Sequence, residues 1–196
     1  MQNHEEEIKL FLKQNFTDIL LISETHFTTK NYFSIPRYTV YYTNHPDGTA
    51  HGGTAILIKE TIEHYELLKY EEDSIQATSV KVKGFPYEIT ITAVYPPPRH
   101  NLKKEYFKTL FQTLGPKFIA GGDYNSKHTI WDSRLTTTKG RELSKVIQEK
   151  NVSFLSTGTP KYWPTDRNKI PDLLDFFVTN GISSTYTGIQ SSYDLT

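Results

Sequence analysis

The sequence predicts an α/β domain in which two β-sheets pack face to face and helices cover their outer faces. Most of its apolar runs have the length of strands, and 13 tyrosines and 11 phenylalanines suit a β-rich interior. The helical and strand patterns do not alternate regularly, which disfavours a doubly wound nucleotide-binding fold. No internal repeat or linker divides the 196 residues, so we expect one domain with a core of its own.

The first half of the chain predicts one helix and five strands. Asn3 followed by Glu6 is typical of a capping box, and Ile8, Phe11 and Leu12 follow at helical spacing. The strands that we expect after this helix occupy residues 18–23, 38–42, 54–59, 75–82 and 88–95.

The strand at 88–95 has a clear period of two. Ile89, Ile91, Ala93 and Tyr95 fall on one face, and three prolines end the strand. The second half of the chain adds helices at 103–114 and 140–150 and strands at 117–120, 152–155, 173–179 and 185–189. The residues from 157 to 171 are rich in proline, threonine and charge, which is typical of a surface loop.

Polar side chains stand where predicted strands end. They are Glu24, Tyr95, Asp123 with Asn125, and Asp175. Strand ends are where ligands and catalytic groups gather in α/β sheets, although each of these residues taken singly also suits an ordinary loop or turn. Asp175 stands between two leucines and two phenylalanines, so we expect it to be buried and to need a partner.

These groups indicate a magnesium-dependent chemistry. The sequence has 0 cysteines and no paired-histidine zinc motif, and oxygen ligands suit Mg²⁺ or Mn²⁺. A glutamate, an aspartate, an asparagine and a tyrosine are the side chains that phosphodiester hydrolysis needs: one holds the metal, one orients a water, and two steady the phosphate.

The charge balance limits the possible partners. A formal net charge of 0 argues mildly against a protein that coats nucleic acid, but it leaves room for an enzyme that touches a few phosphates. The acidic residues 5–7 stand where a signal peptide would carry basic and apolar ones, and no apolar run reaches membrane-spanning length. We therefore expect an intracellular protein with no membrane partner, and the sequence leaves its oligomeric state open.

Three motifs, in order and spacing, resemble those of the endonuclease/exonuclease/phosphatase superfamily. They are Ile22-Ser23-Glu24-Thr25-His26, Gly122-Asp123-Tyr124-Asn125 and Leu174-Asp175-Phe176. Two further segments, Tyr95-Pro96-Pro97-Pro98-Arg99-His100 and Tyr162-Trp163-Pro164-Thr165, resemble the endonuclease domains of jockey-type non-LTR retrotransposons. This resemblance implies a four-layer α/β sandwich and a Mg²⁺-dependent enzyme that nicks DNA to prime reverse transcription, and hence a nuclear location.

The resemblance also implies a role for each site residue. Glu24 is the metal ligand, Tyr95 lies near the scissile phosphate, and Asp123 positions the attacking water. Asn125 lies beside the phosphate, and Asp175 orients a catalytic histidine.

Two parts of the family pattern do not appear among residues 1–196. In the family, a strand ending in asparagine precedes the first helix, and a Ser-Asp-His segment closes the domain. Here the first helix follows Met1 almost directly, and Leu195 follows Asp194 where the histidine is required. We therefore expect a domain truncated at both ends, with impaired activity.

Four more residues are candidates for substrate binding. His26 and His128 are expected as phosphate contacts or structural donors, and Trp131 as a base-stacking or a core residue. Arg134 belongs, with Lys127, Lys139 and Arg141, to a basic cluster that either touches DNA or forms a solvated helix face. Two other functions stay open: a catalytically inactive retroelement fragment, and a phosphatase or phosphodiesterase of the same superfamily.

Overall fold

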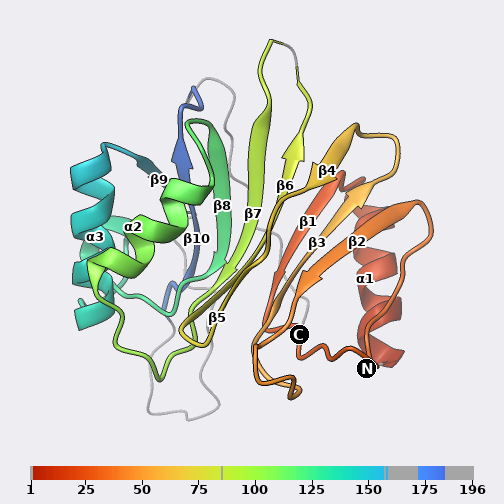
Figure 1. The fold of residues 1–196 in the computed structure, drawn as a ribbon, viewed down its shortest axis with the longest axis horizontal. Coiled ribbons are helices and arrows are strands. Elements are labelled where there is room, and N and C mark those ends of the chain that lie inside the picture. Colours follow the sequence, from red (N-terminus) through yellow and green to blue (C-terminus); the bar gives the residue numbers. More distant parts are fainter. Residues whose placement is uncertain (1, 85, 157, 159–171, 184–196) are drawn as a thin grey trace.

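Four layers make up the computed structural model, which describes residues 2–84, 86–156, 158 and 172–183. One outer layer is α1, the two middle layers are sheets, and the other outer layer holds α2 and α3 (Figure 1). The helices are α1 (Gln2–Gln14), α2 (Lys104–Thr113) and α3 (Thr138–Lys150), with a short 3-10 helix η1 (Thr129–Trp131).

The smaller sheet has the strand order β1-β3-β2 and is antiparallel throughout. The larger sheet has the order β4-β6-β7-β8-β10-β9, with β5 paired to β6, and β7–β8 is its parallel pair. Their strands are β1 (Ile19–Ser23), β2 (Tyr38–Thr43), β3 (Thr54–Lys59), β4 (His64–Glu66), β5 (Tyr70–Glu72), β6 (Ile75–Val82), β7 (Ile89–Tyr95), β8 (Phe118–Asp123), β9 (Ser153–Leu155) and β10 (Asp175–Asn180).

Strand β3 shows how the layers are held together. Ala55 and Leu57 point to the core beneath α1, whereas Ile56 and Ile58 point to the core between the two sheets. Because β3 is central in its sheet and covered on both faces, it is apolar at consecutive positions rather than at alternate ones. A third core lies between the larger sheet and α2 and α3, where Phe107, among others, is fully buried.

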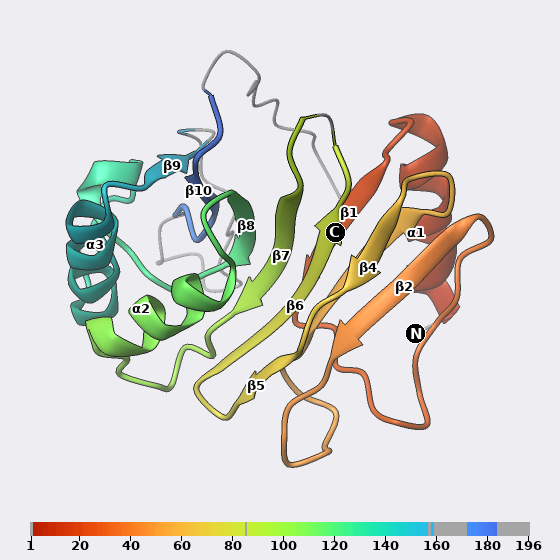
Figure 2. The same ribbon diagram turned by 45° about the horizontal axis from the view of Figure 1, so that its top comes forward.

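The face assignment for β7 is confirmed. Ile91 and Ala93 face the core between the sheets, and Val94 faces the core under α2 and α3. Tyr95 therefore points towards the smaller sheet. Figure 2 shows β1 alongside β7 and β6 across this interface.

The predicted fold class is confirmed, with small differences in the elements. Helix α1 begins at Gln2, so Asn3 stands inside the helix and not at the N-cap position, a difference of the size that is common at helix ends. Strands β4 and β5, which have three residues each, were not predicted. The expected strand at 185–189 and, except for Gly158, the loop at 157–171 lie outside the described residues. Among the described residues, no helix combines the length and apolar character that crossing a membrane requires.

Candidate active site

Four strands bring polar groups to one edge of the sandwich. Strand β7 runs parallel to β8 with Ala93 opposite Gly121, so Tyr95 and Asp123 end neighbouring strands. Strand β10 runs antiparallel to β8, with Asp175 directly opposite Asp123. Residues directly opposite on paired strands point to the same face, so these side chains gather where β1 also ends.

Glu24 and Tyr95 join the two sheets at this edge. The Tyr95 hydroxyl donates a hydrogen bond to the Glu24 carboxylate across 71 residues of sequence. Burial of Tyr95, and then this hydrogen bond, raise the pKa of the phenol far above its ordinary value, so the hydroxyl stays protonated. Glu24 itself is exposed and has a left-handed backbone, with φ of 56°.

Ser23 and Gly122 bring the sheets into close contact beside this pair. The Ser23 hydroxyl donates to the carbonyl of Val94 and accepts from the backbone N–H of Asp123, both at 3.1 Å. Gly122 has φ of +148°, and a Cβ atom there would lie 2.1 Å from the Val94 carbonyl oxygen. Only glycine fits, and its absence of a side chain lets the end of β8 reach β1.

Asp123 is half-buried and held by Asn125. The Asn125 backbone N–H donates to Asp123 Oδ1 at 2.7 Å and its side-chain amide donates to Oδ2 at 3.1 Å. The first bond makes an Asx-type turn, so the turn chemistry indicated by the sequence is present. Burial, followed by the negative charges of Asp175 and Glu24, raises the pKa of Asp123 to about 7, against a lowering by the Asn125 backbone bond.

The prediction that Asp175 is buried is wrong. Phe176 and Val178 point into the core under the helices, so Asp175 and Phe177 face the opposite side. On that side the described part of the smaller sheet lies against β6, β7 and β8. Asp175 is therefore exposed although its sequence neighbours are apolar.

Lys139 is a further polar group near the site. It is 5% exposed, and its ammonium donates to the carbonyl of Pro97 at 2.7 Å. Burial lowers its pKa to about 8, while the charge of Asp123 acts in the opposite direction. Helical spacing could have revealed it, because Lys139 precedes Leu143 by four residues and so shares the inward face of α3.

The residues predicted to bind substrate differ in their burial and contacts. The prediction that Trp131 contacts substrate is wrong, because its indole is 0% exposed, stacks on Phe176 and donates to the Ser126 carbonyl. A ring that is fully covered cannot stack on a base, so its core interpretation holds. His128 caps η1, where its Nδ1 accepts from the backbone N–H of Ile130. Arg134 is exposed.

The predicted basic cluster does not form as one surface. Lys139 is buried, and Lys127 forms an ion pair of 2.9 Å with the buried carboxylate of Asp172. Burial would raise the pKa of Asp172, but this pair and two backbone hydrogen bonds lower it overall. The pair ties the segment after β8 to the start of β10 and was not expected from the sequence.

His26 lies beside Glu24. It has φ of 54°, is exposed, and its backbone N–H donates to the carbonyl of Gly52 at 2.9 Å. Its ring Nδ1 is 3.2 Å from the carbonyl of Ala50. The turn before β3 therefore packs against the residues that follow β1.

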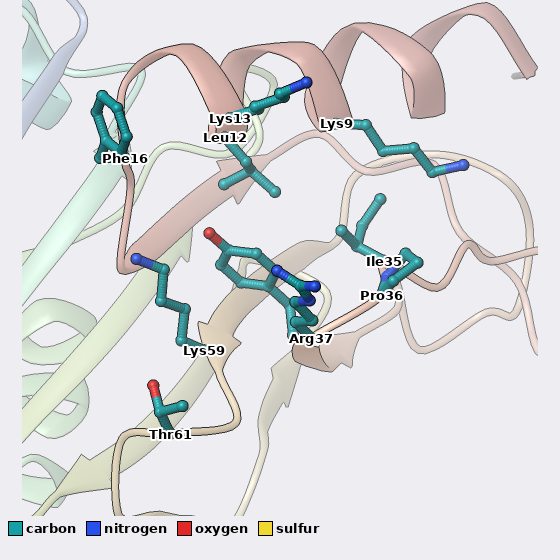
Figure 3. Close-up of a pocket in the computed structure, with 10 residues that line it drawn as sticks. Lys9, Leu12, Lys13, Phe16, Ile35, Pro36, Arg37, Lys59 and Thr61 are labelled. Atoms are coloured by element: carbon teal, nitrogen blue, oxygen red, sulfur yellow. The ribbon is translucent and has the colours of Figure 1, made fainter.

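A cavity of about 640 Å³ lies elsewhere, between α1 and the outer face of the smaller sheet. Figure 3 shows Lys9, Lys13, Arg37 and Lys59 around an apolar floor that includes Leu12. Lys9 and Lys59 form ion pairs with acidic neighbours. Its residues Tyr38 and Lys59 lie at the end of the smaller sheet where β1 begins, whereas Glu24 follows the other end of β1.

The donor set at the strand ends fits a hard divalent cation. Glu24, Asp123 and Asp175 are carboxylates whose mutual repulsion raises the pKa of Asp123, and a cation would relieve that repulsion. All the side-chain donors are oxygens, which suits Mg²⁺ or Mn²⁺. Glu24 lies exposed at the rim of this group.

Comparison with known proteins gives consistent matches. The sequence model of the endonuclease-reverse transcriptase family matches residues 89–194. The RNA-directed DNA polymerase from the mobile element jockey of Drosophila melanogaster is 34% identical over 190 residues, which are 97% of this chain and 21% of that protein. The chain thus spans about a fifth of the length of the curated relatives it matches.

Solved structures share the fold. The endonuclease domain of TRAS1, a telomere-specific non-LTR retrotransposon, has a TM-score of 0.70 and 21% identity, covering 90% of this chain and 78% of that one. The AP endonuclease LMAP from Leishmania major has a TM-score of 0.74 and 11% identity, covering 92% of this chain and 74% of that one.

Proposed function

The chain belongs to the endonuclease-reverse transcriptase family of the endonuclease/exonuclease/phosphatase superfamily, and on that premise we propose that it is a metal-dependent domain that nicks DNA. Its relatives include an enzyme described as an RNA-directed DNA polymerase of a mobile element. The proposed nick would supply the primer end for reverse transcription, and we propose the nucleus as its location.

One observation carries the proposal: side chains from four strands meet at one edge and offer oxygen donors alone. Glu24, held by the Tyr95 hydroxyl, is the proposed ligand of Mg²⁺ or Mn²⁺. When bound, the ion would supply a positive charge that polarises the scissile phosphate and neutralises charge developing on it.

Asp123 is the proposed acceptor that orients the attacking water. Its half-buried carboxylate, held by Asn125, would accept a hydrogen bond from that water and set its direction of attack. Asn125 fixes this carboxylate with one amide hydrogen bond, and its second amide N–H is then available to a phosphate oxygen. Lys139 favours the ionised form of Asp123 and holds the backbone at Pro97, after the strand that bears Tyr95.

We also propose that these 196 residues by themselves act weakly. No histidine of the sequence stands in a Ser-Asp-His motif, and that motif carries the general acid–base group in the related enzymes. Such a group is worth roughly 10²–10⁴ in rate.

A plasmid assay tests both parts of the proposal. The 196-residue chain is compared with the same chain extended by an asparagine-ending strand before Met1 and a Ser-Asp-His segment after Thr196, both from a jockey-type relative. We expect nicking of supercoiled DNA near background without the extensions and Mg²⁺-dependent nicking with them. The activity should vanish with Asp123→Ala and persist with Glu71→Gln, which alters an exposed residue of β5.

Three results would contradict the proposal. An extended chain that hydrolyses a small phosphate ester but leaves plasmid intact would indicate a phosphatase. An extended chain inert on both substrates would indicate an inactive remnant. Strong nicking by the unextended chain, abolished by Asp123→Ala, would show that a histidine within it, with His128 the first to test, replaces the missing one.

A further inference from the structure

Three metal-ligating side chains cluster outside the site described above, on the segment that joins β2 to β3. His45, Asp47 and His51 each offer one ligand atom, and these three atoms lie within 4.8 Å of one another. The two imidazole rings are in contact, with centroids 3.9 Å apart. No role in the proposed nicking reaction involves these residues.

Each histidine of the cluster lies at nearly ligand spacing from an oxygen of Asp47. His45 Nδ1 lies 3.1 Å from Asp47 Oδ1, and His51 Nε2 lies 3.5 Å from Asp47 Oδ2. Nitrogen and oxygen ligands bind Zn²⁺ at about 2.0–2.2 Å, so neighbouring ligands of a tetrahedral site are about 3.3–3.6 Å apart. Small adjustments of the side chains would therefore complete such a site.

His45 is an unusual residue in the described part of the chain because it is 3% exposed and its Nε2 atom has no hydrogen-bond partner there. Its Nδ1 atom faces Asp47, either donating to the carboxylate or accepting weakly from the backbone N–H. Both tautomers leave Nε2 buried and unsatisfied. The ring nitrogen that faces the cluster is Nδ1, so an ion held between His45 and Asp47 would bind there and would replace the weak contact of Nδ1 with the backbone N–H.

The contacts of His51 set its tautomer. Arg99 Nη2 lies 3.5 Å from His51 Nε2, and a guanidinium can only donate, so Nε2 presents its lone pair. The proton is then on Nδ1, which donates to the Thr49 hydroxyl at 2.5 Å. The Nε2 lone pair faces the carboxylate of Asp47, so two acceptors meet where a cation between them would be favourable.

Asp47 is held in position for binding. Its Oδ1 accepts from the backbone N–H and from the hydroxyl of Thr49, both at 2.9 Å. The carboxylate is thus fixed before any ion arrives, which lowers the entropy cost of binding.

We propose that His45, Asp47 and His51 form a second metal site, which binds one transition-metal ion of the Zn²⁺ class. Two imidazoles and one carboxylate are the ligands that Zn²⁺ favours, whereas the oxygen-only group around Glu24 suits Mg²⁺. Three protein ligands leave the fourth tetrahedral position to water. The exposed side chain of Arg99 turns away on binding, because its charge and that of the ion repel each other.

The ion would stabilise a segment that borders the proposed catalytic residues. Just after His51, the carbonyls of Gly52 and Gly53 accept hydrogen bonds from the backbone N–H groups of His26 and Thr25. A metal that ties His45 to His51 therefore fixes the turn against which the residues after Glu24 pack.

Metal titration of the untagged 196-residue chain tests the proposal. Competition with a chromophoric chelator should show one tight Zn²⁺ per chain, and Co²⁺ should give the visible absorption of tetrahedral coordination. His51→Ala should weaken Zn²⁺ binding at least tenfold and abolish that absorption. The control His64→Ala changes a histidine of edge strand β4 and should leave both unchanged, as should Glu24→Gln and millimolar Mg²⁺.

Equal Zn²⁺ binding by the wild type and His51→Ala, or no stoichiometric binding by the wild type, would overturn the proposal. His51 is 36% exposed, so the fold of its alanine variant should survive, as circular dichroism without metal will show. If that variant unfolds, Asp47→Asn decides the question, because it preserves shape and removes the ligand charge. A failure of plasmid nicking would not affect this result, because the readout is metal binding alone.

Discussion

Asp123 is a half-buried carboxylate with two acidic neighbours, so the stability of the protein should depend on whether this carboxylate is ionised. The pKa of Asp123 is about 7 in the folded chain, whereas the ordinary pKa of an aspartate, which applies to the unfolded chain, is 3.8. Between these values the native state keeps a proton that the unfolded state has lost, so stability falls as pH rises through this window. A shift of about 3 units corresponds to at most about 4 kcal/mol.

We therefore expect the free energy of unfolding of the wild type relative to Asp123→Asn, measured with urea and without metal, to decrease from pH 4 to pH 7, because the variant lacks this titration. Added Mg²⁺ should reduce this relative decrease by stabilising the ionised carboxylate. Parallel pH profiles for the wild type and Asp123→Asn would refute the assignment of the raised pKa to Asp123.

Two neighbours should move the titration of Asp123 in opposite directions. The charge of Asp175 raises its pKa, and the charge of Lys139 lowers it. Asp175→Asn should therefore lower the pKa of Asp123, and Lys139→Met should raise it by a smaller amount. NMR titration of the Asp123 carboxyl carbon measures both shifts, and a change of the same sign in the two variants would contradict this arrangement.

The end of β8 depends on Gly122 more than on any propensity of the strand. An alanine Cβ there would lie 2.1 Å from the Val94 carbonyl oxygen and 2.7 Å from Ser23 Oγ. Relief of this contact requires β8 to move away from β7 and β1. We expect Gly122→Ala to cost at least about 4 kcal/mol in the free energy of unfolding, which is exceptional for one methyl group.

Gly115 provides the matched control. It also has a positive φ, of +79°, but a Cβ atom there would meet nothing within 4 Å. Gly115→Ala should therefore cost only the backbone term, about 1–2 kcal/mol. Similar losses in the two variants, measured by chemical unfolding, would show that backbone conformation rather than the close approach of the strands makes Gly122 necessary.

The charge of the whole chain determines the electrostatic part of its affinity for DNA. With 22 basic and 22 acidic residues, it has no general excess of positive charge. Moreover, Lys127, Lys59, Lys104 and Lys9 are engaged in ion pairs with acidic side chains. The domain should therefore release few counterions from duplex DNA.

We expect the logarithm of the affinity for non-specific duplex DNA, measured in EDTA to prevent cleavage, to fall with the logarithm of salt concentration with a slope of about −1 to −3. This slope corresponds to roughly 1–3 neutralised phosphates. A slope steeper than about −5 would reveal an extended basic surface that neither the composition nor the ion pairs indicate.

Short-range patterns in the sequence were sufficient to predict most of the elements. The alternation in β7 placed Tyr95 on the face of Ala93, and the predicted helices at 103–114 and 140–150 lie within two residues of α2 and α3. Hydrophobic period and turn chemistry depend on residues that are close in the sequence, so they can be recognised without knowledge of the fold. The three-residue strands β4 and β5 are too short to carry such a period, and they depend on pairing with β6.

The sequence by itself determined which residue types stand at the strand ends, and hence the choice of Glu24, Tyr95, Asp123, Asn125 and Asp175. Only the tertiary structure decided their surroundings. Burial depends on what covers a face: Asp175 is exposed because β10 extends past the strands that the described part of the smaller sheet covers, whereas Trp131 is enclosed. Contacts across 71 residues, such as Tyr95 with Glu24, arise because the packing of two sheets joins segments that no local pattern relates.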